Sequence, residues 1–500
     1  MIWCRSMRWL EVILRRGVDS EIARLAIRAC AVGVLCLGLG TPLLALPAQA
    51  GAVAKGIEER RLETPGAGPE VTDPLIDEIG SGGLRAKWTR IFVDWRAAQP
   101  QAPPAQYNEA YFLQLDHVIS RFHEQGVRVI LTELRVPEWA SDSSLWSAPP
   151  KGYAKGYQPF YPPAPHHIAD FGTLGRELAE RFSKYGVLYE CWNEPNLYYY
   201  LYPQRRSGKP YFGVNTYLNM LKAFSRGVKA GVEAANPGAT ARVIAGANSP
   251  RGGDDALSTS PQRFAGYLKD HGAAKYFDAY SHHPYQTGGS KSLAPDRPPY
   301  NPRNSVTLGN LQQLLRLFPN KPFYLTEYAY STRDVKIGLV GVSEVQQASY
   351  LRKALAVAGK YRQVKVLMWY LLKDSGPYYN PSGYTYLYTG LRKFDGTIKL
   401  SWYAFAGGNS LSLTAPSRAR ASKAFAIRGR LANRQGPLAG KRLQLESRLP
   451  SRSAWTILKR TSTRADGTYS FASVRQKHTR LYRVKWNGVK LSATRKVRTP

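Results

Sequence analysis

The chain has 500 residues, an apolar fraction of 43% and a net charge of +35. This length allows one large domain with a small one, or two or three medium ones, and the apolar fraction is that of a globular protein. Cys191 is the only cysteine beyond residue 50, so a chain cleaved there has no internal disulfide.

The first 50 residues have the pattern of a secretory signal peptide. Arg24 and Arg28 precede the apolar run AVGVLCLGLGTPLLALP, and Ala48-Gln49-Ala50 supplies an A-x-A cleavage site. An uncleaved membrane anchor is the alternative, but the modest length of the run and its two prolines argue against it. We therefore expect a secreted, extracellular protein with no membrane span after cleavage.

Residues 51–408 alternate between amphipathic helical patterns and short apolar strand patterns. The seven clear strand runs are WTRIFVDW (88–95), VRVILTEL (127–134), VLYECWNE (187–194), ARVIAGAN (241–248), FDAYSHHPY (277–285), KPFYLTEYAY (321–330) and VKVLMWYLL (364–372). A weakly marked first strand is expected within residues 51–58. The pattern predicts an α/β fold, a (β/α)8 TIM barrel. A doubly wound open sheet is the alternative, but no strand is followed by a Gly-rich phosphate-binding sequence.

Polar and aromatic residues lie at or near the ends of most of these strands. The C-terminal ends of barrel strands form one rim, which holds the active site, so these side chains are expected to converge. They are Arg90, Asp94, Trp95, Glu133, Asn193, Glu194, Asn248, His282, His283, Tyr285, Glu327 and Trp369.

A small, basic module is expected after the barrel. Residues 409–423 are interpreted as a linker, and residues 424–500 show short alternating runs typical of a β-sandwich, similar to immunoglobulin-like or fibronectin-like modules. From Asn409 onward, 22 Lys and Arg face only two acids, a net charge of +20. This charge favours attraction to an anionic polymer, for instance at a cell surface; general solubility is the alternative.

Glu194 and Glu327 are the candidate catalytic pair. Cleavage of a glycosidic bond needs a proton donor for the leaving oxygen and a group that attacks or stabilises the anomeric carbon, and two carboxyl groups supply both. A separation of about 5 Å gives retention of configuration, whereas a wider one admits water and gives inversion. Each glutamate taken alone could instead be a structural ion-pair partner.

The stretch YECWNEPN (189–196), followed by HHPY and LTEY, resembles glycoside hydrolase clan A, whose barrels carry catalytic glutamates on strands four and seven. The resemblance covers about residues 51–408. Within the clan, VPEWAS (136–141) makes the chain most similar to family 39 and the bacterial exopolysaccharide hydrolases near it. Family 5, which is cellulase-like, is the second choice; Glu133, where many family 5 enzymes carry His, favours family 39.

The resemblance implies a role for each matching position. Glu194 would be the general acid/base and Glu327 the nucleophile. The substrate-binding residues that it implies are Asn193, Arg90, His283, Tyr285 and Trp369. Trp139 is expected to line the sugar cleft, with loop packing as the alternative. No metal or organic cofactor is implied, since adjacent strand residues such as the two histidines point to opposite faces.

Simple electrostatics and backbone preferences agree with these roles. Arg90 and Tyr285 are expected to lower the pKa of Glu327, and the negative Glu327 to raise the pKa of Glu194. Pro195 is expected to hold Glu194 in an extended backbone conformation.

The sequence thus predicts a secreted retaining glycoside hydrolase that acts on a β-linked poly- or oligosaccharide by double displacement. The alternative is a catalytically silent carbohydrate-binding or cell-surface-associated barrel, but the joint presence of the candidate site residues argues against lost catalysis. Charge-driven nucleic-acid binding would need a basic face with aromatic platforms on the barrel. Because the charge lies in the C-terminal module, no nucleic-acid partner is expected.

Overall fold

The computed structural model describes residues 53–500, except 287–288, 336–337, 381–382, 408–409, 434–435, 487–489 and 493. The expected signal peptide, residues 1–50, lies outside the described residues. In this described part of the chain, no helix combines the length and apolarity that crossing a bilayer requires.

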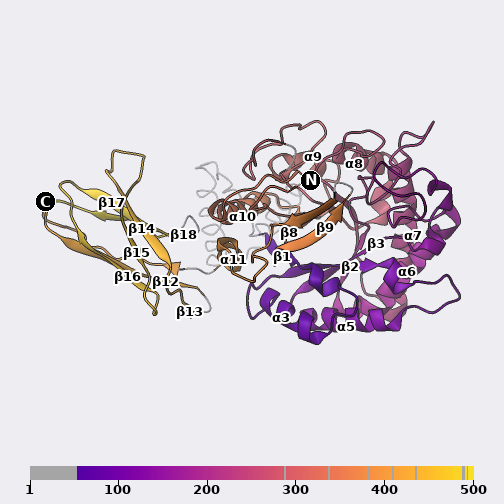
Figure 1. The fold of residues 1–500 in the computed structure, drawn as a ribbon, viewed down its shortest axis with the longest axis horizontal. Coiled ribbons are helices and arrows are strands. Elements are labelled where there is room, and N and C mark those ends of the chain that lie inside the picture. Colours follow the sequence, from indigo (N-terminus) through magenta and orange to yellow (C-terminus); the bar gives the residue numbers. More distant parts are fainter. Residues whose placement is uncertain are drawn as a thin grey trace, which may run out of the picture. The chain divides into compact units, whose positions relative to one another are not determined.

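Eight parallel strands form a closed barrel in sequence order (Figure 1). They are β1 (Ala54–Glu58), β2 (Trp88–Asp94), β3 (Arg128–Leu134), β4 (Leu188–Cys191), β5 (Val243–Asn248), β6 (Ala279–His282), β7 (Phe323–Tyr328) and β8 (Val364–Tyr370). Strand β1 pairs with both β2 and β8 and so closes the ring. The predicted (β/α)8 barrel is confirmed, and its first strand lies within the expected window.

Helices surround the barrel. They are α3 (Pro69–Ile79), α4 (Trp95–Ala98), α5 (Glu109–Glu124), α6 (Ile168–Phe182), α7 (Phe212–Ala235), α8 (Pro261–Asp270), α9 (Gln312–Leu315), α10 (Glu344–Ala358) and α11 (Leu400–Ala406). Polar side chains cap several of them: Asn108 accepts from the backbone N–H of Tyr111 at α5, and Ser343 from that of Gln346 at α10.

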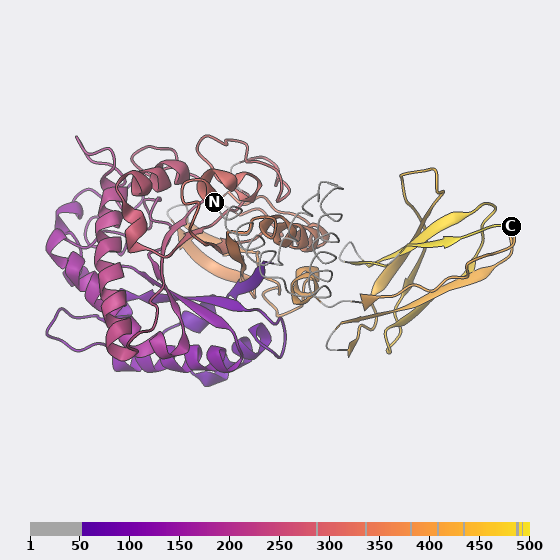
Figure 2. The same cartoon turned by 180° about the vertical axis from the view of Figure 1, so that it is seen from behind.

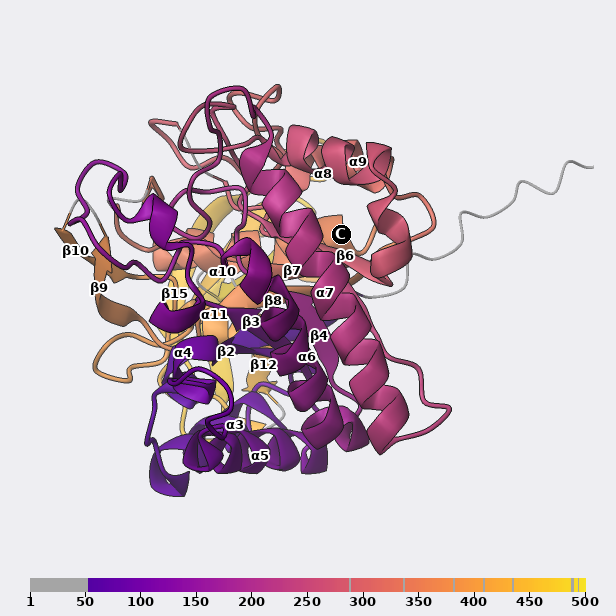
Figure 3. The same ribbon diagram turned by 90° about the vertical axis from the view of Figure 1, so that its right-hand side faces the viewer.

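Helices α6 and α7 lie side by side next to β4 (Figure 3). A Cβ atom on Gly227 would lie 1.8 Å from the carbonyl oxygen of Gly172 on the facing helix. Glycine is therefore required at position 227, because backbone atoms occupy the space that a side chain would need. This close contact packs two helices beside the strand that ends in YECWNEPN.

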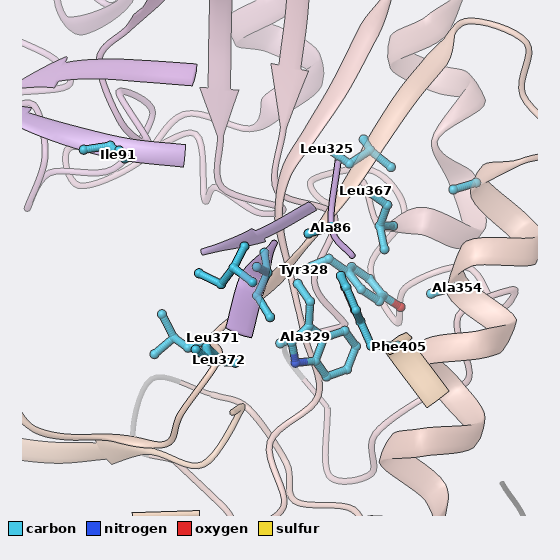
Figure 4. Close-up of a cluster of buried hydrophobic side chains, with 14 of the residues drawn as sticks. Ala86, Ile91, Leu325, Tyr328, Ala329, Ala354, Leu367, Leu371, Leu372 and Phe405 are labelled. Atoms are coloured by element: carbon cyan, nitrogen blue, oxygen red, sulfur yellow. The ribbon is translucent and has the colours of Figure 1, made fainter. Parts of the chain in front are cut away.

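Side chains of the barrel strands alternate between the barrel interior and the helical layer. Residues of the helical layer form a large apolar cluster, in which Leu325 of β7 and Leu367 of β8 lie with Ala354 of α10 and Phe405 of α11 (Figure 4). A smaller interior cluster is formed by Trp88, Ile130, Leu188, Ile244, Ala279, Tyr324, Val366 and Met368. On four strands, the next interior position, two residues after the apolar one, is polar. These polar residues are Arg90, Thr132, Glu190 and Thr326.

Antiparallel strands follow the barrel, first a hairpin of β9 (Ser375–Asn380) and β10 (Gly383–Leu387). Beyond α11, the strands near the C-terminus form two antiparallel sheets, coloured orange to yellow in Figure 2. One sheet has the order β11-β12-β13 with β16 beside β12, and the second has the order β15-β14-β17-β18 with β19 beside β17. Their strands are β11 (Ser410–Leu411), β12 (Phe425–Asn433), β13 (Gly436–Pro437), β14 (Arg442–Arg448), β15 (Thr456–Ser462), β16 (Thr468–Val474), β17 (Arg480–Trp486), β18 (Lys490–Leu491) and β19 (Arg495–Val497).

The two sheets pack through apolar inner faces, so the predicted β-sandwich is confirmed. The ring of Phe425 on β12 lies 6.0 Å from the ring of Tyr482 on β17, measured between centroids. Strand β11 lies in the stretch that was expected to be a linker, and it pairs with β12. That stretch therefore also contributes main-chain pairing to the sandwich.

Candidate active site

A sharp turn after β4 places Asn193 and Glu194 at the rim of the barrel. The φ angle is 71° at Trp192 and 41° at Glu194, in the left-handed region that few non-glycine residues adopt. The backbone N–H of Glu194 donates to Ala247 O at 3.0 Å. The expectation of an extended Glu194 is wrong. The hydrogen bond to β5 outweighs the preference for extended backbone that a residue before proline has.

Arg90, on β2, contacts polar groups from two other strands and from the turn after β4. Its Nη1 lies 2.7 Å from Glu327 Oε1, and its Nη2 lies 2.6 Å from Glu190 Oε2. Nη2 also donates to Asn193 Oδ1 at 2.9 Å. Burial alone would lower the pKa of Arg90, but the surrounding carboxylates raise it above its ordinary value. The fully buried guanidinium is therefore the permanent cation at the centre of the site.

Glu58, at the end of β1, is a further carboxyl group beside Arg90. Its Oε2 lies 3.5 Å from Arg90 Nη1, and within the described residues neither of its oxygens has a hydrogen-bond partner. Burial, and then the charge of Glu327, raise the pKa of Glu58 well above its usual range. A protonated Glu58 leaves Arg90 balanced by the carboxylates of Glu190 and Glu327.

Glu327 is the penultimate residue of β7, in a stretch where the register with β8 is irregular between Leu325 and Tyr328. Such an irregularity re-aims a side chain at a strand end. Glu327 accepts from Arg90 Nη1 at 2.7 Å and from the Tyr285 hydroxyl at 2.9 Å. Both donors lower its pKa as expected, but burial outweighs them, so the pKa lies above its ordinary value and the expected net lowering is wrong.

His283 lies between the two candidate catalytic glutamates. Its Nδ1 is 3.0 Å from Glu194 Oε1 and 3.7 Å from Glu327 Oε2. One carboxylate oxygen of each glutamate and a His283 nitrogen all lie within 4.8 Å of one another. Burial lowers the pKa of His283 well below its usual range, so the imidazole is neutral. The three residues expected to converge at the rim do so.

A chain of hydrogen bonds fixes which nitrogen of His283 carries the proton. Glu190, paired with Arg90, accepts from Thr326 Oγ1 at 3.2 Å. Because the hydroxyl proton of Thr326 is already donated to Glu190 in a hydrogen bond, Thr326 Oγ1 acts as the acceptor for His283 Nε2, also at 3.2 Å. The Nδ1 of the neutral ring is then an acceptor and takes a hydrogen bond from a protonated Glu194 at 3.0 Å.

The pKa of Glu194 is raised more than that of Glu327, which agrees with a proton on Glu194. Burial, reinforced by the charge of Glu327, raises the pKa of Glu194 well above its usual range. Glu327 is raised less, because Arg90 and Tyr285 favour its ionised form. The arrangement thus pairs a protonated acid with a carboxylate.

The trio of Glu194, His283 and Glu327 offers two oxygens and one nitrogen that could hold a divalent metal ion. Metal ligands must be deprotonated. Glu194 carries a proton that is donated to the His283 nitrogen facing it, so two of the three ligand atoms are already engaged. The geometry favours proton transfer over metal binding.

Trp369 does not face the site, contrary to expectation. Its side chain is fully buried in the helical layer, its ring contacts Tyr328, and its Nε1 donates to Thr389 O at 2.8 Å. Because successive strand residues point to opposite sides, the interior position beside it is Tyr370, which is partly exposed. Tyr370 lies close enough to Tyr285 to help raise its pKa, after burial and the charge of Glu327.

Trp139, expected in the sugar cleft, and Glu133, expected at the rim, also lie elsewhere. Trp139 is partly buried; its Nε1 donates to Gln99 O, and its ring packs edge-on against Trp95 and His167. These contacts correspond to the loop packing considered as the alternative. Glu133 points into the helical layer, where it is fully buried, and the adjacent Thr132 faces the interior and donates to Glu190 at 2.7 Å.

Glu58, Glu190 and Thr326 are site residues that the sequence reasoning missed. Glu190 and Thr326 could have been found by counting in steps of two from the interior apolar residues of β4 and β7. Glu58 could not, because the first strand was too weakly marked to assign a register.

A comparison with protein-family models agrees with the barrel. The model of the family described as Cellulase (glycosyl hydrolase family 5) matches residues 54–371. A comparison with curated protein sequences finds no match.

Similar solved structures include the exo-beta-1,4-mannosidase Op5Man5 from Opitutaceae bacterium strain TAV5, 14% identical with a TM-score of 0.46 over 71% of this chain. This chain spans 58% of the length of that mannosidase. A GH5_18 protein from Streptomyces cattleya in complex with GlcNAc is 13% identical, with a TM-score of 0.48 over 71% of this chain and 79% of the other. Endo-glycoceramidase II from Rhodococcus sp. is 13% identical, with a TM-score of 0.43 over 85% of this chain and 97% of the other.

Proposed function

This chain belongs to glycosyl hydrolase family 5, and on that premise we propose that it is a secreted, retaining β-glycosidase acting on a β-linked poly- or oligosaccharide. Family 5 is the second of the two families that the sequence resembles. The residue that favoured family 39, Glu133, faces the helical layer rather than the site, so it says nothing about the catalytic residues.

The spacing of Glu194 and Glu327 is the observation that carries the proposal. One oxygen of each lies within 4.8 Å of the other. Retaining glycosidases hold their carboxyl groups about 5 Å apart, whereas inverting ones leave room for a water between them. This spacing supports direct attack by a carboxylate on the anomeric carbon.

In the first step, Glu194 donates its proton to the glycosidic oxygen while Glu327 attacks the anomeric carbon. The bond from carbon to the leaving oxygen breaks, and an ester to Glu327 forms. Esterification removes the negative charge of Glu327, which is one cause of the raised pKa of Glu194. Glu194 can then accept a proton from water, and the resulting attack releases the sugar with its original configuration.

Asn193 is suited to bind the sugar. Because its Oδ1 accepts from Arg90 Nη2 at 2.9 Å, the orientation of its amide is fixed and the NH2 group is directed away from the guanidinium. That NH2 group can donate to a hydroxyl of the sugar beside the anomeric carbon, and such bonds strengthen in the transition state. Tyr370 supplies the aromatic surface under the sugar in place of Trp369.

Secretion and surface attachment are parts of the same proposal. The A-x-A-terminated leader supports export, and the C-terminal module carries a net charge of +20. We propose that this module attracts an anionic polymer outside the cell and so keeps the enzyme near its substrate.

The alternative is a barrel that binds glycans without cutting them. Reducing-sugar release from a panel of β-linked glycans, measured for the mature protein and its Glu327→Gln variant, separates the two. Hydrolysis that is lost in the variant, with an initial product of retained anomeric configuration by NMR, would support the proposal. Inverted product would contradict the retaining mechanism, and glycan binding without any release would favour the silent barrel.

A further inference from the structure

Six cations of the C-terminal module lie on one face of the five-stranded sheet. Along β14 and β17, side chains alternate between the sandwich interior, as at Leu445 and Val484, and the outer surface. The outer face of this sheet carries a set of six cations that we call the basic face. Its members are Arg442, Arg448, Arg460, Arg483, Lys485 and Lys496.

Strand register arranges four of these cations in two rows. On β14, Gln444 pairs with Arg460 on one side and Lys485 on the other, so these cations are two strand spacings apart, roughly 10 Å. In the second row, Leu481 pairs with Arg448 on one side and Lys496 on the other. The rows are four residues apart along β14, roughly 14 Å.

Between the rows, Glu446 is the single acid that faces this surface among the described residues. It lies 2.7 Å from Arg483 Nε and 3.9 Å from Lys485 Nζ. The other acid of the module, Asp466, lies in the turn between β15 and β16. One carboxylate therefore cannot neutralise six cations, and the face keeps a strong positive charge.

An aromatic residue on the same surface is already covered. The guanidinium of Arg483 lies 4.1 Å and that of Arg448 5.1 Å from the ring of Trp455. Nucleic-acid binding modules of the stacking type need a free aromatic surface for a base. The covered indole instead holds two guanidinium groups in place, and planar guanidinium groups suit bidentate binding of carboxylates.

We propose that the basic face binds an acidic polysaccharide, a chain with carboxylate-bearing sugars, and that it holds the barrel on that polymer. The binding itself follows from charge complementarity on a flat, regularly spaced surface. The consequence for catalysis rests on the proposed function. Each exposed ion pair is weak, so affinity would come from several contacts made at once and would fall steeply with salt.

The test uses the full mature protein and polygalacturonate as the probe, at low and at high NaCl. The triple variant Arg460→Gln, Lys485→Gln, Lys496→Gln removes three cations from the two rows, leaves Trp455 unchanged, and keeps the ion pair of Glu446 with Arg483. A matched variant, Arg464→Gln, Arg475→Gln, Lys477→Gln, removes the same charge from exposed positions outside the basic face. We expect the first to weaken binding about tenfold at low salt and the second to change it little.

Equal losses in both variants would overturn the proposal, because binding would then depend on total charge rather than on this face. Absence of binding to polygalacturonate, or tighter binding to duplex DNA or to anionic lipid vesicles, would also overturn it. Hydrolysis of a small neutral glycoside should be unchanged in both variants. If that activity is missing from the unmodified protein while polygalacturonate binding persists, the proposed function fails and the basic face stands.

Discussion

Thr326 Oγ1 accepts a hydrogen bond from His283 Nε2 at 3.2 Å, and through this bond the carboxylate of Glu190 influences a proton on the other side of the imidazole. Without the hydroxyl, no other acceptor among the described residues would hold His283 in the Nε2–H form. The ring could then carry its proton on Nδ1 and donate to Glu194, which would favour the ionised form of that acid.

The Thr326→Val variant should therefore have a lower pKa for Glu194 and a lower kcat. We expect the alkaline limb of the kcat/KM profile to move to lower pH and kcat to fall about tenfold. Thr326→Ser keeps the hydroxyl and should leave the limb in place. A profile that is identical in all three proteins would show that Thr326 only fills space.

The two glutamates should respond differently to the leaving group. In Glu194→Ala, substrates with a good leaving group such as dinitrophenol should keep most of their kcat/KM, because the first step then needs no proton, while the kcat/KM of substrates with poor leaving groups should fall about 100-fold or more. The kcat should fall for both kinds of substrate, because no base is left to accept a proton from water in the second step. In Glu327→Gln both kinds should lose activity by a similar, large factor, because the attacking group is gone. Initial rates with a series of aryl glycosides measure this, and the reverse pattern would exchange the two roles.

Substitutions of the adjacent Tyr370 and Trp369 should have different effects, the first on kcat/KM and the second on stability. Tyr370→Ala removes an aromatic surface at the rim, so kcat/KM should fall about tenfold or more with little change in unfolding free energy. Trp369→Phe removes a buried hydrogen bond to Thr389 O and some core volume, at about 1–3 kcal/mol of stability. Its KM should stay the same. A raised KM in Trp369→Phe would place the indole in the substrate path after all.

Glu133 should make stability depend on pH. Burial raises its pKa well above the usual range, and within the described residues neither oxygen has a hydrogen-bond partner. The native protein thus binds this proton more tightly than the unfolded chain does. The contribution of Glu133 to stability is complete below about pH 4.3, its unfolded pKa, and is lost as the pH rises toward the folded value.

The Glu133→Gln variant has no proton to lose, so its stability relative to the unmodified protein should increase with pH, by at most about 1.4 kcal/mol per pH unit. Urea unfolding between pH 5 and pH 8 measures this difference. Glu70→Gln, at an exposed position on α3, is the matched control, and its difference in unfolding free energy from the unmodified protein should not change with pH. A flat difference for Glu133→Gln as well would mean that the carboxyl reaches a partner in solution.

The amino-acid pattern predicted the barrel and the strands that carry the main residues because period-two and period-3.6 patterns are local. It placed Glu194, Glu327, Arg90, His283 and Tyr285 correctly at one rim. Their convergence follows from the topology of parallel strands, which requires no knowledge of individual contacts.

The errors occur where a local rule meets a tertiary constraint. Trp369 and Tyr370 differ by one strand position, and only the register of β8 in the barrel decides which one faces inward. The left-handed backbone at Glu194 depends on a hydrogen bond to Ala247, 53 positions later, which no local preference encodes. The pKa of Glu327 depends on how much water the folded site excludes, and no sequence motif predicts this depth of burial.

The contacts of Arg90 have a consequence for how the enzyme is made. Its ion pair with Glu327 spans 237 positions and its hydrogen bond with Asn193 spans 103, so the site is built almost entirely from contacts between distant segments. Such contacts form late, after the loops between them have closed. Until strand seven has left the ribosome and docked, a nascent barrel contains Glu194, the proposed proton donor, but lacks Glu327, the proposed nucleophile. Hydrolysis should therefore appear only once the ring closes, which would make enzyme activity a direct reporter of completed folding.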